Sequence, residues 1–152
     1  MTKTLIRHAN TGDFEVLLEI DVASFPGGVA YDAAELAYFM SREGAETIVA
    51  EVNGTIVAFL IVEVHRGHRT ATIVTLDVQQ SERRSGLGSQ LLKRSEEILA
   101  DHGVESYDLQ VDVTNGAAIR FYKKHGFTTI RTLRNYYANG NDAYLMVKDL
   151  MS

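Results

Sequence analysis

The chain has 152 residues, of which 45% are hydrophobic and 23% are charged, and its formal net charge is −5. This length suits a single globular domain over residues 1–152, and no linker or low-complexity run divides it. Basic residues, including the Arg83-Arg84 pair, are scattered along the chain, so the charge pattern of a nucleic-acid-binding protein is missing. The sequence has no cysteine, which excludes disulfides, thiolate metal sites and a cysteine acyl-enzyme, so any group transfer should be direct.

The N-terminal residues 1–7 lack an apolar signal region, and no apolar run approaches the ~18–20 residues needed to cross a membrane. We therefore expect a cytoplasmic protein that binds neither membrane nor nucleic acid. His65 and His68 have the spacing of metal ligands, but they bracket a turn, which favours a solvated hairpin end. No metal site is predicted.

Apolar periodicity and turn signals divide the chain into helices and strands. Residues 10–13 offer caps for the first helix, Asp32 can cap the second, and Asn53-Gly54 is a typical hairpin turn. The apolar stripe of the first helix is expected to include Leu17 and Val22. In chain order, the expected elements are strand 4–8, helices over about 14–22 and 33–40, strands 47–52, 55–64 and 70–78, helix 89–101, strand 107–113, helix 116–124, and strands 127–133 and 143–148.

This element order predicts an α/β (α+β) fold, with one mixed, mostly antiparallel twisted sheet of about seven strands and helices on both faces. Residues 24–31, which contain the only proline, form the loop between the first two helices. In the strand at 107–113, Asp108, Gln110 and Asp112 alternate with apolar residues and should share one face.

The stretch Arg83-Arg84-Ser85-Gly86-Leu87-Gly88 lies between a predicted strand and the helix expected to begin at Ser89. Its glycines let the backbone approach a ligand, and the free N–H groups of the helix start point toward an anion. The helix dipole adds ~0.3–1 kcal/mol for a negative group and each hydrogen bond to a charged oxygen ~1.5–3 kcal/mol, so this loop could hold a pyrophosphate. On spacing alone, a helix start with solvated arginines explains the stretch equally well.

A second block, Asn115-Gly116-Ala117-Ala118-Ile119-Arg120-Phe121-Tyr122-Lys123-Lys124-His125-Gly126-Phe127, follows after about 30 residues that contain a strand. With the glycine loop and the element order, it resembles the GNAT superfamily of N-acetyltransferases over nearly the whole chain. The resemblance implies that acetyl-CoA is the co-substrate and that its acetyl group passes directly to a primary amine.

The resemblance also implies roles for individual residues. The loop would hold the pyrophosphate, the preceding strand would pair with the pantetheine arm, and the Val78 N–H would donate to the thioester oxygen. Tyr122 would be the general acid that protonates the departing thiolate, although packing within its own helix is the alternative. The implied cofactor-binding residues are Leu76, Asp77, Val78, Arg83, Arg84, Ser85, Gly86, Leu87, Gly88, Ser89, Asn115 and Tyr122.

Two further places resemble the RimI-like N-terminal acetyltransferases. Residues 136–146 carry a similar Tyr-Tyr, Gly, Asp-Ala, Met pattern, and residues 25–31 resemble the loop that lines the peptide site of those enzymes. The resemblance implies that aromatic side chains hold an extended N-terminus, whereas bracing of a hairpin is the alternative for the tyrosine pair. The implied substrate-binding residues are Phe25, Pro26, Tyr31, Gln110, Tyr136 and Tyr137.

Gln110 stands where such relatives carry a glutamate or histidine that helps to remove the amine proton, and glutamine cannot act as a base. With pKa values of ~8 for an α-amine and ~10.4 for lysine, roughly 10% and ~0.04% are neutral at pH 7, a difference of ~3 kcal/mol. The site therefore favours a protein N-terminus, for which a ribosomal protein is one candidate. Asp77 is the leading replacement base and Asp112 shares the face of Gln110, although a hydrogen-bonded role is the alternative for each.

Two other functions stay open. A GNAT enzyme could act on a small amine or polyamine, and a binding module could hold acetyl-CoA without turnover. The chain could be a monomer or a homodimer, since its sequence does not distinguish the two.

Overall fold

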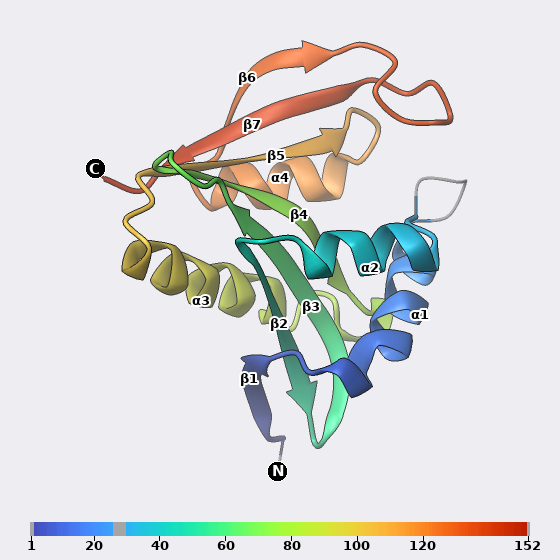
Figure 1. The fold of residues 1–152 in the computed structure, drawn as a ribbon. Coiled ribbons are helices and arrows are strands. Elements are labelled where there is room, and N and C mark those ends of the chain that lie inside the picture. Colours follow the sequence, from blue (N-terminus) through green and yellow to red (C-terminus); the bar gives the residue numbers. More distant parts are fainter. Residues whose placement is uncertain (1, 26–29, 152) are drawn as a thin grey trace.

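The computed structural model describes residues 2–25 and 30–151 (Figure 1). The strands are β1 (Thr4–His8), β2 (Ala45–Val52), β3 (Thr55–Val64), β4 (Thr70–Val78), β5 (Ser106–Asp112), β6 (Thr128–Leu133) and β7 (Ala143–Asp149). The α-helices are α1 (Phe14–Ser24), α2 (Ala33–Ser41), α3 (Leu87–Asp101) and α4 (Gly116–Lys124), with the short 3-10 helices η1 (Thr11–Asp13) and η2 (Gln80–Glu82).

The seven strands form one sheet in the order β1-β2-β3-β4-β5-β7-β6. Every neighbouring pair is antiparallel except β4 and β5, which are parallel. Helices α1 and α2 cover one face and α3 covers the other (Figure 1). The predicted mixed, mostly antiparallel sheet with helices on both faces is therefore confirmed.

Local capping explains where the first helices begin. Asp32 accepts a hydrogen bond from the backbone N–H of Glu35 at 2.8 Å, and the Glu35 carboxylate accepts from the Asp32 N–H at 3.0 Å. Asn10 forms a similar capping box ahead of η1 and α1. Helix α3 begins two residues before the expected Ser89, because Gly86 adopts a left-handed φ of 87° and becomes its N-cap.

The predicted apolar stripe of the first helix is wrong at Val22, which is 56% exposed. The buried residues of α1 are Leu17, Ile20 and Asp21, at the i, i+3 and i+4 spacing of one helix face. Because each residue turns the helix by about 100°, the stripe through position 17 excludes position 22. Asp21 therefore belongs to the buried stripe of α1, and Val22 does not.

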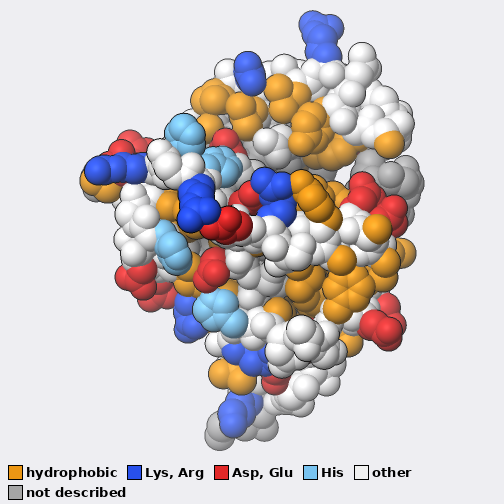
Figure 2. Space-filling model, in the orientation of Figure 1, with side chains coloured by type: hydrophobic (Ala, Val, Ile, Leu, Met, Phe, Trp, Pro, Cys, Tyr) orange, Lys and Arg blue, Asp and Glu red, His pale blue; other side chains and the backbone are white. Residues whose placement is uncertain are grey.

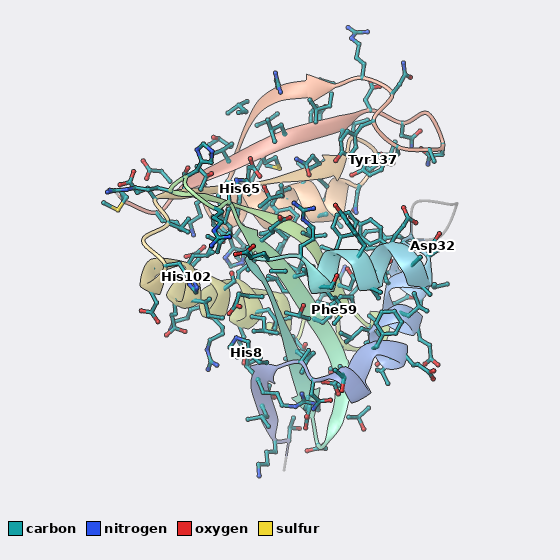
Figure 3. The ribbon with its side chains drawn as sticks, viewed as in Figure 1. His8, Asp32, Phe59, His65, His102 and Tyr137 are labelled. Carbon is teal, nitrogen blue, oxygen red and sulfur yellow. The ribbon has the colours of Figure 1, made fainter. Side chains whose placement is uncertain are left out.

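Two hydrophobic clusters fill the two faces of the sheet. Phe59, at the centre of β3 (Figure 3), is fully buried beneath α1 and α2 with Leu17, Leu36 and Ile61. The larger cluster lies between the sheet and helices α3 and α4. Figure 2 shows further hydrophobic side chains on the surface, and Ile130 of the edge strand β6 is 58% exposed.

The sheet opens between its two halves. Strands β4 and β5 pair only from Thr70 to Thr72 against Ser106 to Asp108, and then diverge (Figure 1). The strands part after Thr72, six residues before β4 ends at Val78. The opening therefore extends along most of β4.

A bulge in β4 decides which side chains face α1 and α2. Val74 has no partner on β3, because Val62 pairs with Ile73 and Ile61 pairs with Thr75. The extra residue reverses the alternation of the strand beyond it. As a result, Asp77 lies opposite Phe59 on the α1–α2 face, although its position in a regular strand would place it on the face of Ile73.

Candidate active site

A cavity of about 620 Å³ occupies the opening between β4 and β5. Its wall includes parts of α1, the loop after β4, the start of α3, β5 and α4. It brings together most of the residues predicted from the sequence, namely Phe25, Tyr31, Leu76, Asp77, Val78, Arg83, Arg84, Gly86, Leu87, Gly88, Ser89, Gln110, Asn115, Tyr122 and Tyr137.

Two predicted site residues that the structure describes, Ser85 and Tyr136, are not part of this wall. Ser85 lies in the loop, and its hydroxyl donates to the carbonyl of Glu82. Tyr136 is 48% exposed and packs edge-on against Tyr137, with ring centroids 5.0 Å apart. Pro26 lies outside the described residues. The tyrosine pair therefore contributes one ring to the cavity and one to the surface.

The start of α3 has the properties of an anion site. Gly86, its N-cap, offers no side-chain hydrogen bond to the first helical N–H groups, in contrast to Asp32 at α2. A Cβ added at Gly88 would lie 3.0 Å from the ring of Phe121, so the bare backbone is needed there. Arg83 lies beside this helix start, where its Nε donates to the Val78 carbonyl at 3.0 Å. Uncapped N–H groups, glycine and arginine together fit a pyrophosphate.

Asn115 has a second task besides the one expected for it. Its side-chain oxygen accepts a hydrogen bond from the Ala118 N–H at 3.2 Å and thereby caps α4. The amide nitrogen of the same side chain carries only donors and cannot take part in that cap, so a cofactor contact through it stays a prediction. The cap on α4 thus fixes the orientation of the Asn115 side chain, for which the resemblance implies a contact with the cofactor.

Tyr122 lies on the buried side of α4 and is only 8% exposed. Its ring packs edge-on against Phe121 and Phe127, with centroids 5.4 and 5.5 Å away. Burial raises the pKa of its hydroxyl above the ordinary value, and the nearby charge of Asp77 raises it further. The hydroxyl therefore stays protonated at neutral pH, as a general acid requires.

Asp77 belongs to the cavity wall but is almost fully buried, with an exposed fraction of 1%. Its Oδ1 accepts a hydrogen bond from the Thr75 hydroxyl at 2.5 Å, and its Oδ2 is shut off from solvent. Burial raises the pKa of this carboxyl well above its ordinary value, and the hydrogen bond and charge of Asp21 raise it further. A catalytic base at Asp77 stays a prediction.

The polar face of β5 supplies no free carboxylate at Asp112. Its oxygens accept hydrogen bonds from the Thr114 N–H and hydroxyl at 2.9 and 2.7 Å and from the Asn141 amide at 2.9 Å. Although burial opposes it, the hydrogen bonds from Asn141 and Thr114 lower the pKa of Asp112. This carboxylate braces the adjoining loops, and Gln110 remains the neutral polar group of β5 at the cavity.

Tyr31 and Tyr137 come to the cavity from different halves of the molecule. The Tyr31 hydroxyl donates to the carbonyl of the bulge residue Val74 at 3.4 Å, and its ring packs against Phe39 at 4.9 Å. Tyr137 lies beside the tip of β5, whereas Asp32, the neighbour of Tyr31, begins α2 across the opening (Figure 3). Aromatic rings with polar tips therefore line the end of the cavity away from α3.

The sequence pattern missed several residues of the cavity wall, including Asp21, Ser24, Glu82 and Phe121. The sequence did contain a signal for Asp21. It lies four residues after Leu17, and residues i and i+4 share one helix face, so it lies on the buried face of α1. Phe121 could not be found in this way, because its contact with the glycine loop depends on how α3 and α4 pack.

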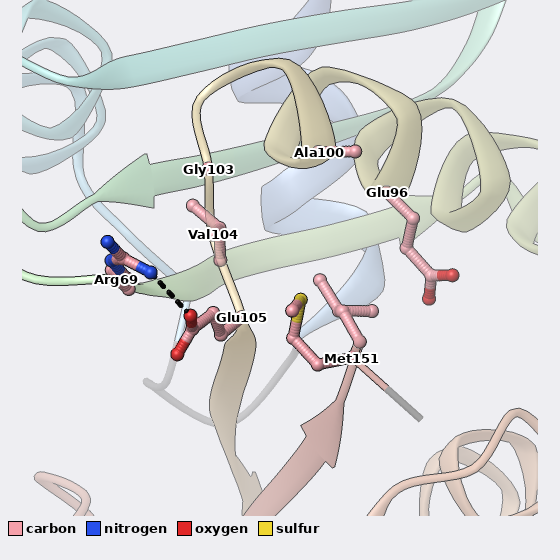
Figure 4. A pocket seen from close by; sticks show the side chains of 8 residues that line it. Arg69, Glu96, Ala100, Gly103, Val104, Glu105 and Met151 are labelled. Carbon is pink, nitrogen blue, oxygen red and sulfur yellow. Dashed lines mark hydrogen bonds and ion pairs between the residues drawn. The ribbon is translucent and has the colours of Figure 1, made fainter.

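A second cavity of about 350 Å³ lies between the end of α3 and the end of the chain (Figure 4). Its charged groups are already paired: Arg69 contacts Glu105 at 2.8 Å, and Glu96 accepts hydrogen bonds from Tyr107 and Lys148. Within residues 2–25 and 30–151, no group of His, Asp and Glu side chains is arranged to hold a metal ion. None of the described helices has the length and apolarity to span a membrane.

The fold and the uncapped start of α3 fit an acetyltransferase site, and the family comparison agrees. Residues 14–127 match the Acetyltransferase (GNAT) family, so the chain belongs to the GNAT family and is an acetyl-CoA-dependent N-acetyltransferase. The sequence is 31% identical to an N-alpha-acetyltransferase of Sulfurisphaera tokodaii, over 95% of this chain and 92% of that protein.

Two solved structures have the same fold along nearly their whole length. Ard1 from Thermoplasma volcanium superposes with a TM-score of 0.88 at 29% identity, covering 98% of this chain and 99% of the other. The ribosomal-protein-S18-alanine N-acetyltransferase of Escherichia coli gives 0.87 at 27% identity, covering 99% and 96%. The predicted membership of the GNAT superfamily is confirmed, with similarity to N-alpha-acetyltransferases.

Proposed function

We propose that the protein transfers the acetyl group of acetyl-CoA to the N-terminal α-amine of a protein or peptide. The observation that carries this proposal is the contrast between the two ends of one cavity. An uncapped helix start suits the pyrophosphate, and at the other end Tyr31, Tyr137 and Gln110 offer aromatic and neutral polar contacts to an extended chain. The similarity to N-alpha-acetyltransferases supports the same acceptor class.

In the proposed reaction, the amine nitrogen attacks the thioester carbonyl, a C–N bond forms and the C–S bond breaks. The Val78 N–H donates to the oxygen while that oxygen carries negative charge. Tyr122 donates its proton to the departing sulfur, and one of the two protons lost by the ammonium finally replaces it. The other proton passes to solvent, so the products are the amide, CoA and one proton.

The state of the carboxylates that β4 and β5 bring to the cavity supports an α-amine over lysine. Asp112 already accepts three hydrogen bonds, Asp77 is enclosed, and Gln110 cannot take a proton. An α-amine needs little help at pH 7, because roughly 10% of it is already neutral, against ~0.04% of a lysine side chain. Such a cavity selects the more acidic ammonium.

The experiment is thiol release from acetyl-CoA with matched acceptors. One peptide has a free N-terminus and no lysine, its partner has a blocked N-terminus and one internal lysine, and a polyamine is the third acceptor. A peptide with N-terminal alanine is included because of the S18-alanine relative. Faster release with the free N-terminus is expected. Release only with the polyamine would assign a small-amine enzyme, and acetyl-CoA binding without acceptor-dependent release would assign a binding module.

A further inference from the structure

Two buried aspartates meet at the edge of the cavity. Asp21 of α1 and Asp77 of β4 have exposed fractions of 0% and 1%, and both contribute to the cavity wall. The bulge at Val74 directs Asp77 to the face that α1 covers. One oxygen of each carboxyl is already used: Asp21 Oδ2 accepts from the Tyr31 N–H at 2.8 Å, and Asp77 Oδ1 accepts from Thr75 at 2.5 Å.

The two carboxyls lie close enough to interact, and each has a second oxygen. Oδ1 of Asp21 and Oδ2 of Asp77 are both shut off from solvent, and neither has another partner among the described residues. Two adjacent carboxylates cannot both stay ionised there, because like charges repel and burial removes the water that would screen them. One proton resolves this, since the protonated oxygen then donates to its neighbour and both oxygens are satisfied.

The surroundings do not supply the charge that two carboxylates would need. Arg83 is a nearby cation that lowers the pKa of Asp77, but burial and Asp21 raise that pKa more strongly. Tyr31 and Tyr122 have raised pKa values, mainly through burial, and stay neutral. The pair therefore holds a proton across neutral pH.

We propose that Asp21 and Asp77 share one proton and act as a positioning pair that fixes the acceptor end of the cavity to the cofactor strand. Asp21 holds the backbone of Tyr31, whose hydroxyl also reaches Val74 of β4. Asp77 lies between Leu76 and Val78, the residues assigned to the cofactor. The pair thus sets the separation between acceptor and thioester. This role rests on the proposed function, which assigns one end of the cavity to the acceptor and β4 to the cofactor.

The first test counts the proton without measuring turnover. Carbon-13 NMR of the aspartate-labelled full chain at pH 7 should show a protonated carboxyl in the wild type, with the ionised Asp112 as internal reference. Asp21→Asn and Asp77→Asn should each remove that signal, because an amide then replaces the protonated carboxyl as donor. Ionised carboxyls at every aspartate of the wild type would overturn the pair, whatever the acceptor is.

The second test separates positioning from a merely structural role. With the best peptide from the acceptor panel, Asp21→Ala should raise the acceptor KM at least tenfold and change the acetyl-CoA KM less than twofold. Asp21→Asn should raise the acceptor KM less than threefold, because its amide keeps both hydrogen bonds. Equal effects of Asp21→Asn and Asp21→Ala would overturn the proposal. It would also be overturned if Asp77→Asn alone lowered kcat at least a hundredfold and flattened the acidic limb of the pH–rate profile, because Asp77 would then be the base. If no peptide is acetylated, the NMR test still decides the pair.

Discussion

Replacing Tyr122 by Phe removes one hydroxyl from the cavity and leaves the ring packing intact. The ring contacts Phe121 and Phe127, and these contacts do not involve the oxygen. No hydrogen bond joins that hydroxyl to another of the described residues. We therefore expect the free energy of unfolding to change by less than about 0.5 kcal/mol, as for substitutions that remove no buried contact.

The expected effect on catalysis is much larger. General acid catalysis contributes about 10²–10⁴-fold, so kcat should fall at least about a hundredfold, which corresponds to about 2.7 kcal/mol in the barrier. The affinity for acetyl-CoA should stay within about twofold, since the change affects the leaving group and not the pyrophosphate. Thiol release gives kcat, titration calorimetry gives the affinity, and urea unfolding gives the stability.

Tyr107→Phe is the matched control. Tyr107 is also buried, at 1% exposure, but its hydroxyl donates to Glu96 at 2.6 Å, and neither residue lines the active-site cavity. Loss of that charge-assisted bond should cost about 1–3 kcal/mol of stability and leave kcat close to wild type. A Tyr122→Phe enzyme that retained more than a third of the wild-type kcat would refute the general-acid assignment.

Three further predictions concern the backbone and the buried charge. Gly44→Ala should lower the free energy of unfolding by at least about 2 kcal/mol in urea titrations, because φ is +89° and the new Cβ would lie 2.4 Å from the Val64 carbonyl oxygen; an unchanged midpoint would contradict this. Gly88→Val should weaken acetyl-CoA binding at least about tenfold by calorimetry, because Phe121 must move into the cavity. Because the pKa of Asp77 is higher in the folded than in the unfolded chain, its contribution to stability is fully present below pH ~4. This contribution is lost at about 1.4 kcal/mol per pH unit as the pH rises toward the pKa of the folded state. Asp77→Asn should flatten that decline in urea titrations between pH 5 and 9, and parallel curves would count against it.

The helices and strands could be predicted closely because their signals are local. The Asp32 capping box and the Asn53-Gly54 turn depend on neighbours within a few residues, and both elements appear where expected. The parting of β4 from β5 could not be placed in this way. This parting depends on pairing between strands that are distant in the sequence and on the bulge at Val74. The alternating residues of β4 do not indicate that bulge.

Only part of the cavity could be predicted, because only some of its residues belong to local motifs. The glycine loop and Tyr122 belong to contiguous motifs, so a resemblance could identify them. Asp21 belongs to no such motif, and it joins the site only because α1 packs over the strand that carries Asp77. The surroundings of a buried carboxyl are a property of the packed structure, which is why a base and a positioning pair look alike in the sequence.

A peptide that carries two kinds of amine can show whether the acceptor is a chain N-terminus. A single peptide with both a free α-amine and an internal lysine is incubated with the enzyme and acetyl-CoA at pH 7, and tandem mass spectrometry locates the acetyl group at early turnover. We expect acetylation of the α-amine at least about a hundredfold faster than that of the lysine, because the free energy needed to deprotonate the two amines differs by ~3 kcal/mol. Acetylation of the lysine at a comparable or faster rate would contradict it.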